Sequence, residues 1–259
     1  MRNAIKDLFE GVSSLHVWPA LGWQEVKQRY RRSTLGPFWL TLSMGILLAG
    51  MGPLYGKLFN QDVGSYFLYL TVGFIAWQAL SLMLSEGCTV FIASEGFIKS
   101  VRLPFTIHVM RFTWKNIIVM FHNMIVAVVV IAFFQPPLGF GLLLVPIAIL
   151  FYILNGLWLA TILGLLCARF RDIPQIVGSV VQIFFFLTPV IWKPGMLGRH
   201  AWTVDLNPFY HFIEIFRAPL IGEPTNLRSW GVVLAITLAG FAVMLPLFAR
   251  FRQRIAYWL

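Results

Sequence analysis

The sequence predicts an all-α membrane protein with six transmembrane helices, an N-terminal amphipathic interface helix, and a re-entrant helical hairpin on the external side between spans five and six. Three observations lead to this prediction. The 259 residues are 59% hydrophobic and only 12% charged, whereas soluble domains are about 45–50% apolar and about 25% charged. Six apolar stretches of about 20 residues are long enough to cross the roughly 30 Å hydrocarbon core of a bilayer. The basic residues fall mainly in alternate loops.

Residues 1–37 form the predicted cytoplasmic interface segment. Apolar residues recur at helical spacing in residues 1–17, at Ile5, Leu8, Phe9, Val12 and Leu15. Residues 20–34 set an apolar face against a basic face, which includes Lys27, Arg29, Arg31 and Arg32. Such a helix lies in the plane of a membrane interface. An exposed helix that packs on a soluble partner is the alternative. Gly36 and Pro37 then turn the chain into the membrane.

Residues 38–259 are predicted to be a single transmembrane domain. Its spans lie at about 38–59, 66–90, 116–134, 141–167, 175–192 and 231–249. In the first span, Gly52 and Gly56 allow close helix approach, with a lipid-facing kink as the alternative. Fifteen of the 20 Lys and Arg residues fall on one side of this topology. The positive-inside rule therefore places both termini in the cytoplasm. The net charge of +10 follows from this topology and from attraction to anionic lipids, not from binding of nucleic acid.

Two connecting segments differ from ordinary loops. Residues 91–115 are short and mixed in charge, and a short helix with an apolar tip suits docking into a cleft of another protein. Residues 193–230 contain FYHFIEIF at 209–216, which is too apolar for a solvated loop. Backbone that does not span is tolerated at membrane depth only where protein or a cavity covers it. We therefore expect a hairpin that dips into the outer leaflet and acts as an external gate.

The sequence contains no pattern for catalysis, phosphate binding or metal binding. Its Gly56-Lys57 pair lacks the upstream pattern of a phosphate-binding loop, and its five His residues are scattered. The middles of the spans are almost free of charge, which argues against a proton-coupled transporter. A membrane enzyme such as a lipid-linked sugar transferase needs acidic residues placed for a metal, and Glu95 and Asp172 alone do not supply them. We expect no enzyme activity, no cofactor and no metal in this chain.

Aromatic residues are abundant, with 24 Phe, 10 Trp and 7 Tyr. Many lie at predicted interfaces, as aromatic belts require, but Phe184, Phe185 and Phe186 lie inside the fifth span. Aromatic faces suit the apolar faces of sugar rings and allow them to slide. For each single residue, packing against lipid or another helix is the alternative. The residues expected to line a conduit are Trp39, Tyr55, Phe59, Phe184, Phe185 and Phe186.

Five segments, in order along the chain, resemble the transmembrane permease subunit of polysaccharide ABC exporters of the O-antigen, capsule and teichoic-acid type. They are residues 30–39 (YRRSTLGPFW), 94–104 (SEGFIKSVRLP), 169–173 (RFRDI), 186–192 (FLTPVIW) and 207–208 (NP). Each segment alone is a weak to moderate signal, but their order on six predicted spans makes the match strong. The O-antigen permease branch is the most similar.

The resemblance implies a working unit of two copies of this chain and two ABC ATPase subunits, which bind ATP and Mg²⁺. It implies a bacterial inner-membrane location. The cargo is expected to be an undecaprenyl-diphosphate-linked polysaccharide, moved from the cytoplasm to the periplasm. A capsule or teichoic-acid-like polymer, or a drug or lipid, is the alternative cargo.

The same resemblance suggests roles for individual residues. The channel is expected to form from spans one and five of two protomers and from residues 193–220. Arginines at the cytoplasmic headgroup level suit bidentate contact with the lipid diphosphate, with anchoring to anionic lipids as the alternative; these are Arg29, Arg31 and Arg32. The loop expected to couple the channel to the ATPase contains Glu95, Gly96, Phe97, Lys99 and Arg102. The expected periplasmic gate comprises Trp192, Pro208, Phe209 and Tyr210.

Overall fold

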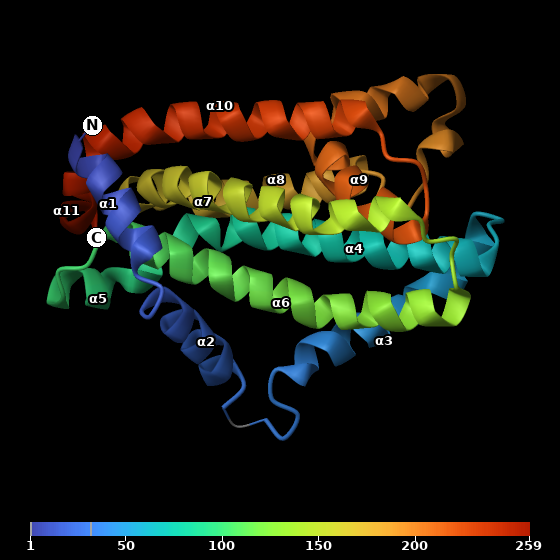
Figure 1. Ribbon diagram of the computed structural model, residues 1–259, viewed down its shortest axis with the longest axis horizontal. Helices are drawn as coiled ribbons and strands as arrows, with labels where there is room; N and C mark the ends of the chain where they lie inside the picture. Colours follow the sequence, from blue (N-terminus) through green and yellow to red (C-terminus); the bar gives the residue numbers. More distant parts are fainter. Residues whose placement is uncertain (1, 32) are drawn as a thin grey trace.

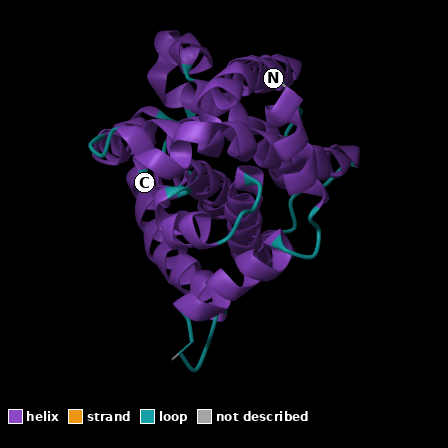
Figure 2. Ribbon diagram, turned by 90° about the vertical axis from the view of Figure 1, so that its left-hand side faces the viewer, coloured by secondary structure: helices purple, strands orange, loops and turns teal. Residues whose placement is uncertain are grey.

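The computed structural model describes residues 2–31 and 33–259, and this part of the chain contains helices and loops but no strand (Figure 2). The helices of the first half are α1 (Arg2–Ser13), α2 (Trp18–Arg29), α3 (Phe38–Leu58), α4 (Val63–Ser85), α5 (Glu95–Ser100) and α6 (Phe105–Phe134). Those of the second half are α7 (Val145–Arg169), α8 (Ile173–Leu187), α9 (Pro208–Ile221), α10 (Leu227–Phe251) and α11 (Ile255–Trp258). Short 3-10 segments connect several of them, the longest being η4 (Pro194–Leu206). The all-α prediction is confirmed.

The long helices lie side by side in one bundle (Figure 1). One end, which we call the terminal end, holds both chain termini, α5 and α11. The opposite end, the distal end, holds the turn between α3 and α4 and the connection from α6 to α7. Helix α4 packs against α3, α6, α8 and α9, and 67% of its apolar window is buried, against 17% for α3. Helix α4 is therefore the centre of the bundle, and α3 lies at its edge.

Among the described residues, five helices are long and apolar enough to cross a membrane: Phe38–Leu58, Val63–Thr89, Phe105–Phe134, Phe140–Arg169 and Leu227–Trp258. They correspond to the predicted spans one, two, three, four and six. The predicted fifth span, 175–192, overlaps α8, which has 15 residues and ends at Leu187. The helix ends there because Pro189 forces the preceding residue out of the helical region, and Thr188 is extended at φ −95° and ψ 138°.

Helix α6, which contains the predicted third span at 116–134, begins earlier, at Phe105. The sequence places basic residues at Arg111 and Lys115, within the predicted cytoplasmic loop 91–115. In the structure these side chains are largely buried and have partners within the bundle; Arg111, for example, donates a hydrogen bond to Ser94 Oγ at 2.9 Å. A helix can begin early when its polar residues are satisfied in this way.

The glycine pair in α3 allows close packing within this chain. A Cβ atom at Gly52 would lie 1.9 Å from the Phe67 ring, and one at Gly56 would lie 3.4 Å from Tyr66. Both neighbours belong to α4. The first of the two interpretations of this pair, close helix approach, is therefore confirmed.

Helix α1 packs on the bundle mainly through small and acidic residues, with Leu8 partly buried beside them. Ala4, Asp7 and Gly11 are buried, whereas Ile5 and Phe9 are 55% and 75% exposed. The Asp7 carboxylate accepts hydrogen bonds from the backbone N–H groups of Phe105 and Thr106, at 3.2 and 3.1 Å, and from the Thr106 hydroxyl at 2.8 Å. It thereby caps the first turn of α6 from another helix.

Asp7→Ala is expected to release α1 from the bundle. The substitution removes the cap of α6 and the ion pair with Arg252 at 3.0 Å, at a cost of about 2–3 kcal/mol. Hydrogen–deuterium exchange of residues 2–13 measures this opening. The matched control is Glu10→Ala, which breaks the exposed pair with Lys6 at 3.5 Å, worth about 0–1 kcal/mol. Equal exchange in the two variants would contradict the capping role.

Candidate functional site

The residues expected to line a conduit fall into two groups. Trp39 and Phe186 are 45% and 64% exposed on α3 and α8. Trp39 lines a groove of about 460 Å³ with Tyr30, Ser43, Ile46 and Leu47. These exposed rings have room for a ligand or for a neighbouring protein surface.

The other predicted rings pack inside the bundle. Tyr55 and Phe59 have ring centroids 5.8 Å apart, and Phe59 lies 6.1 Å from Tyr66 of α4. Phe184 lies 4.9 Å from Phe209. Phe185 packs on α4, 5.5 Å from Phe74 and 5.7 Å from Trp77. These half-buried rings hold α3, α8 and α9 against α4, as aromatic pairs do at such separations.

A tight bend follows α8, and we call residues 188–192 the elbow. Its carbonyl groups accept hydrogen bonds from two tyrosines of α4. Tyr66 Oη donates to the Ile191 carbonyl at 2.6 Å, and Tyr69 Oη lies 3.0 Å from the Pro189 carbonyl and 3.1 Å from the Trp192 carbonyl. Helix α4 thus fixes the path of the chain between α8 and η4.

Arg217 of α9 completes the support of the elbow. Its side chain is almost fully buried; Nη1 donates to the Pro189 carbonyl at 2.8 Å and Nη2 to Glu214 at 2.8 Å. Its guanidinium lies 3.9 Å from the centre of the Tyr69 ring. A buried charge is tolerated only when it is paired and hydrogen-bonded in this way.

Sequence reasoning did not identify Arg217, which it counted only as a basic loop residue. The available signal was the spacing of Glu214 and Arg217, three residues apart on an apolar helix. Residues at i and i+3 are neighbours on a helix. An ion pair within such an apolar segment indicates burial.

The expected gate residues surround the elbow. Trp192 Nε1 donates to the Phe186 carbonyl at 3.0 Å, and both residues line a groove of about 500 Å³ beside η4. Asn207 Nδ2 donates to Thr188 Oγ1 at 2.9 Å, which joins the end of α8 to the start of α9 at Pro208. Tyr210 is half-buried beside His211. The structure therefore brings together two of the segments quoted for the resemblance, 186–192 and 207–208.

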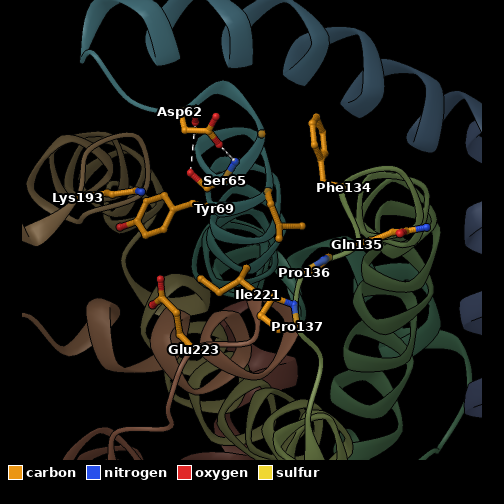
Figure 3. Close-up of a pocket in the computed structure, with 12 residues that line it drawn as sticks. Asp62, Ser65, Tyr69, Phe134, Gln135, Pro136, Pro137, Lys193, Ile221 and Glu223 are labelled. Atoms are coloured by element: carbon orange, nitrogen blue, oxygen red, sulfur yellow. Dashed lines mark hydrogen bonds between the residues drawn. The ribbon is translucent and has the colours of Figure 1, made fainter.

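A polar pocket of about 340 Å³ opens next to the elbow at the distal end (Figure 3). Asp62 caps α4 by accepting from the Ser65 N–H at 2.9 Å, and this hydrogen bond lowers the pKa of Asp62. Lys193 lies across the Tyr69 ring at 5.4 Å. Glu223 and Gln135 also line the pocket.

The predicted coupling loop contains the short helix α5 at the terminal end (Figure 1). Lys99 forms an ion pair with Glu95 at 2.6 Å, and this pairing lowers the pKa of Glu95. Phe97 is 47% exposed, and a Cβ atom added at Gly96 would meet nothing within 4 Å. Arg102 is exposed after the helix. The apolar tip of α5 is free to contact another protein.

A network of charges connects the coupling loop to α2. Lys115 forms ion pairs with Glu86 at 2.6 Å and with Glu25 at 2.9 Å. Arg111 lies 3.5 Å from Glu25 and donates to Ser94, which directly precedes α5. Ser94, Arg111 and Glu25 thus connect the residue before α5 to α2 through side-chain contacts.

The three arginines expected near the lipid diphosphate differ in their surroundings. Arg29 is paired with Glu86 at 3.3 Å, whereas Arg31 is exposed in the turn between α2 and α3. Arg32 lies outside the described residues. Among residues 2–31 and 33–259, no group of three His, Cys, Asp or Glu residues is arranged to hold a metal ion.

Comparisons with known proteins agree with this architecture. The family model described as ABC-2 type transporter matches residues 16–221. The O-antigen export system permease protein RfbA of Myxococcus xanthus is 25% identical over 199 residues, which are 75% of this chain and 76% of that protein. A protein of the same name from Klebsiella pneumoniae is 23% identical over 242 residues, which are 89% of this chain and 91% of that protein. The resemblance drawn from the sequence is thereby confirmed.

Proposed function

The chain belongs to the ABC-2 type transporter family, and from this premise we propose that it is the channel-forming permease subunit of an ATP-driven polysaccharide exporter. The proposed cargo is an undecaprenyl-diphosphate-linked glycan of the O-antigen class, which crosses the bacterial inner membrane to the periplasm. Two copies of the chain work with two ABC ATPase subunits, which bind ATP and Mg²⁺. Its relatives, which are O-antigen export system permease proteins, support this cargo class.

The observation that carries the proposal is the unpacked face of α3. Only 17% of its apolar window is buried, and its exposed side chains include Trp39, Ile46 and Leu54. A Cβ atom at Gly45 or Gly50 would meet nothing within 4 Å, so packing within this chain does not require these glycines. Small residues on a membrane helix permit close approach of another helix. A second copy of the chain is the partner that this face suits.

In the proposed topology, α8 is the sixth crossing. Both termini lie at one end of the bundle (Figure 1), and a chain with both ends on one side must cross an even number of times. The five long helices give an odd number. Helix α8 rises about 22 Å at 1.5 Å per residue, and the extended elbow adds the remaining length. The excess of basic residues at the terminal end supports a cytoplasmic location for that end.

We place η4 and α9 in the outer leaflet as the re-entrant hairpin. Helix α9 is apolar, and most of its residues from His211 to Leu220 are buried against the spans. The backbone of a non-spanning segment needs such cover at membrane depth. Because Arg217 and Asn207 connect α9 to the elbow, a movement of the hairpin would move the end of α8. This coupling suits a periplasmic gate.

Helices α1 and α2 are assigned to the cytoplasmic interface. The apolar residues Ile5 and Phe9 of α1 point away from the bundle, as expected when they enter the headgroup region of a bilayer. Helix α2 packs on α6 and leads to the exposed Arg31. The exposure of Arg31 at this turn supports the proposal that basic residues meet the lipid diphosphate near the first span.

Replacing Arg31 and Arg32 together with alanine is expected to weaken capture of the lipid-linked glycan. One basic residue near a membrane surface contributes about 1 kcal/mol, so the pair contributes about 2 kcal/mol, or about 30-fold in affinity. Export at low glycan concentration measures this loss. The control is Lys6→Ala with Arg250→Ala, which removes the same charge from two exposed residues outside the proposed channel and gate. If the first variant inserts normally and exports at the wild-type rate, the phosphate role is wrong.

Deletion of the gene for this chain from its bacterium tests the proposed cargo. The lipid-linked glycan is expected to accumulate on the cytoplasmic face of the inner membrane. When the gene is supplied again, the glycan is expected to reappear at the cell surface. Unchanged surface glycan would contradict the proposal. If a drug or a simple lipid accumulated instead, the alternative cargo would be correct.

A further inference from the structure

A groove at the terminal end of the bundle is not used by the proposed transport function. It lies between the last turns of α7 and α10 and the short helix α11, and its volume is about 340 Å³. Its floor is apolar and includes Ile162, Leu166 and Leu247. Its rim carries Arg169 and Arg254.

The two rim arginines lack acidic partners. No acidic residue lines the groove, and among the ion pairs of the described residues neither Arg169 nor Arg254 takes part. Both side chains are exposed. Their positive charge is therefore available to an anion from outside the chain.

Aromatic rings hold these guanidinium groups near the groove. Arg169 lies 5.5 Å from the centre of the Phe170 ring and 5.4 Å from that of Trp258. Arg254 lies 6.0 Å from the Phe251 ring. Contacts of this kind restrain a cation without neutralising it. The guanidinium edges remain able to form bidentate hydrogen bonds with phosphate oxygens.

The floor of the groove extends along a predicted membrane span. Arg169 is the last residue of α7, and Leu166 and Ile162 lie about one and two turns before it. At 1.5 Å per residue, Ile162 is about 10 Å deeper than Arg169 along the helix. A phosphate at the level of the arginines would therefore leave an acyl chain beside Leu166 and Ile162. A soluble protein partner does not reach that depth in a bilayer.

We propose that this groove binds an anionic phospholipid, with its phosphate between Arg169 and Arg254 and an acyl chain along Leu166 and Ile162. Basic pockets between membrane helices on the cytoplasmic side suit anionic headgroups. The bound lipid would also hold α11 against the end of α7, because Trp258 of α11 lines the groove and contacts Arg169 of α7. This site does not depend on what the chain transports.

Native mass spectrometry of the purified full chain, with dioleoyl phosphatidylglycerol or dioleoyl phosphatidylcholine added, tests the site. The wild-type chain is expected to prefer phosphatidylglycerol. In the variant with Arg169→Gln and Arg254→Gln, that preference is expected to fall by about 10- to 30-fold. The matched control is the variant with Lys6→Gln and Arg102→Gln, which removes two exposed charges outside the groove. Leu166→Trp fills the floor without changing charge and is expected to reduce binding of both lipids.

Three results would overturn the proposal. The first is unchanged phosphatidylglycerol binding in the double variant. The second is an equal loss in the control with Lys6→Gln and Arg102→Gln, which would indicate only general attraction to the basic surface. The third is displacement of the lipid by inorganic phosphate at millimolar concentration, which would make a free anion the ligand. If the first result occurred together with loss of ATPase binding in the double variant, the groove would be assigned to the ATPase instead.

Discussion

Replacing Arg217 with leucine is expected to destabilise the folded bundle by about 3–5 kcal/mol, because removing one partner of a buried ion pair leaves the other charge uncompensated. Glu214 is only 12% exposed at its side chain and would lose its cation. The Pro189 carbonyl would lose one of its two donors and keep only Tyr69 Oη. Thermal unfolding of the purified chain in detergent measures the loss. Arg217→Lys is expected to recover only part of it, since an ammonium does not reproduce the planar contacts with Pro189, Glu214 and Tyr69.

The matched control for Arg217 is Arg228→Leu. Arg228 forms an ion pair with Asp205 near the same end of the bundle, but its side chain is 60% exposed. Exposed pairs of this kind contribute about 0–1 kcal/mol. If Arg217 supports the elbow, the two variants must differ clearly in unfolding temperature. Equal unfolding temperatures would show that Arg217 does not support the elbow.

Replacing Phe97 with aspartate is expected to prevent association with the ATPase while the chain folds normally. Phe97 is 47% exposed at the tip of α5, so its removal takes little from the packing of this chain. An aromatic side chain buried at the centre of an interface contributes about 2–4 kcal/mol, which corresponds to a loss of affinity of about 30-fold or more. Co-purification of the two subunits measures it.

The control for Phe97 is Phe140→Asp at the distal end, where the same change affects a ring that is 92% exposed. Both variants lose an exposed aromatic side chain and gain a charge. Only the Phe97 variant is expected to lose the ATPase. If both variants retain the ATPase, α5 is not the docking element, and the exposed residues that follow it, such as Arg102, become the next candidates.

The spans could be predicted because length and apolarity decide them. The first span matches closely, since Gly36 and Pro37 mark its start in the sequence. The start of α6 could not be predicted in the same way, because Arg111 and Lys115 are polar residues whose partners come from α2, from the residue before α5 and from the end of α4. The ion pairs and hydrogen bonds of these two residues allow the segment before residue 116 to be helical. A local sequence pattern does not show such partners.

The candidate site could be predicted in part. The segments at 186–192 and 207–208 were identified, and the structure places them together. The exposure of individual rings could not be predicted, because Phe184, Phe185 and Phe186 are consecutive, and the orientation of the helix decides which of them faces outward. The pairing of Arg217 with Glu214 has a local signal in their spacing, but the contact of Arg217 with the Pro189 carbonyl could not be predicted, because the two residues are far apart in the sequence.

Reconstitution of the chain with its candidate ATPase in lipid nanodiscs tests the central claim most directly. The measurement is ATP hydrolysis with and without lipid-linked glycan, on a complex of determined stoichiometry. We predict a stable complex of two permease and two ATPase subunits whose hydrolysis rate changes when the glycan is added. A complex that ignores the glycan but responds to small amphiphiles, or no complex at all, would contradict polysaccharide export.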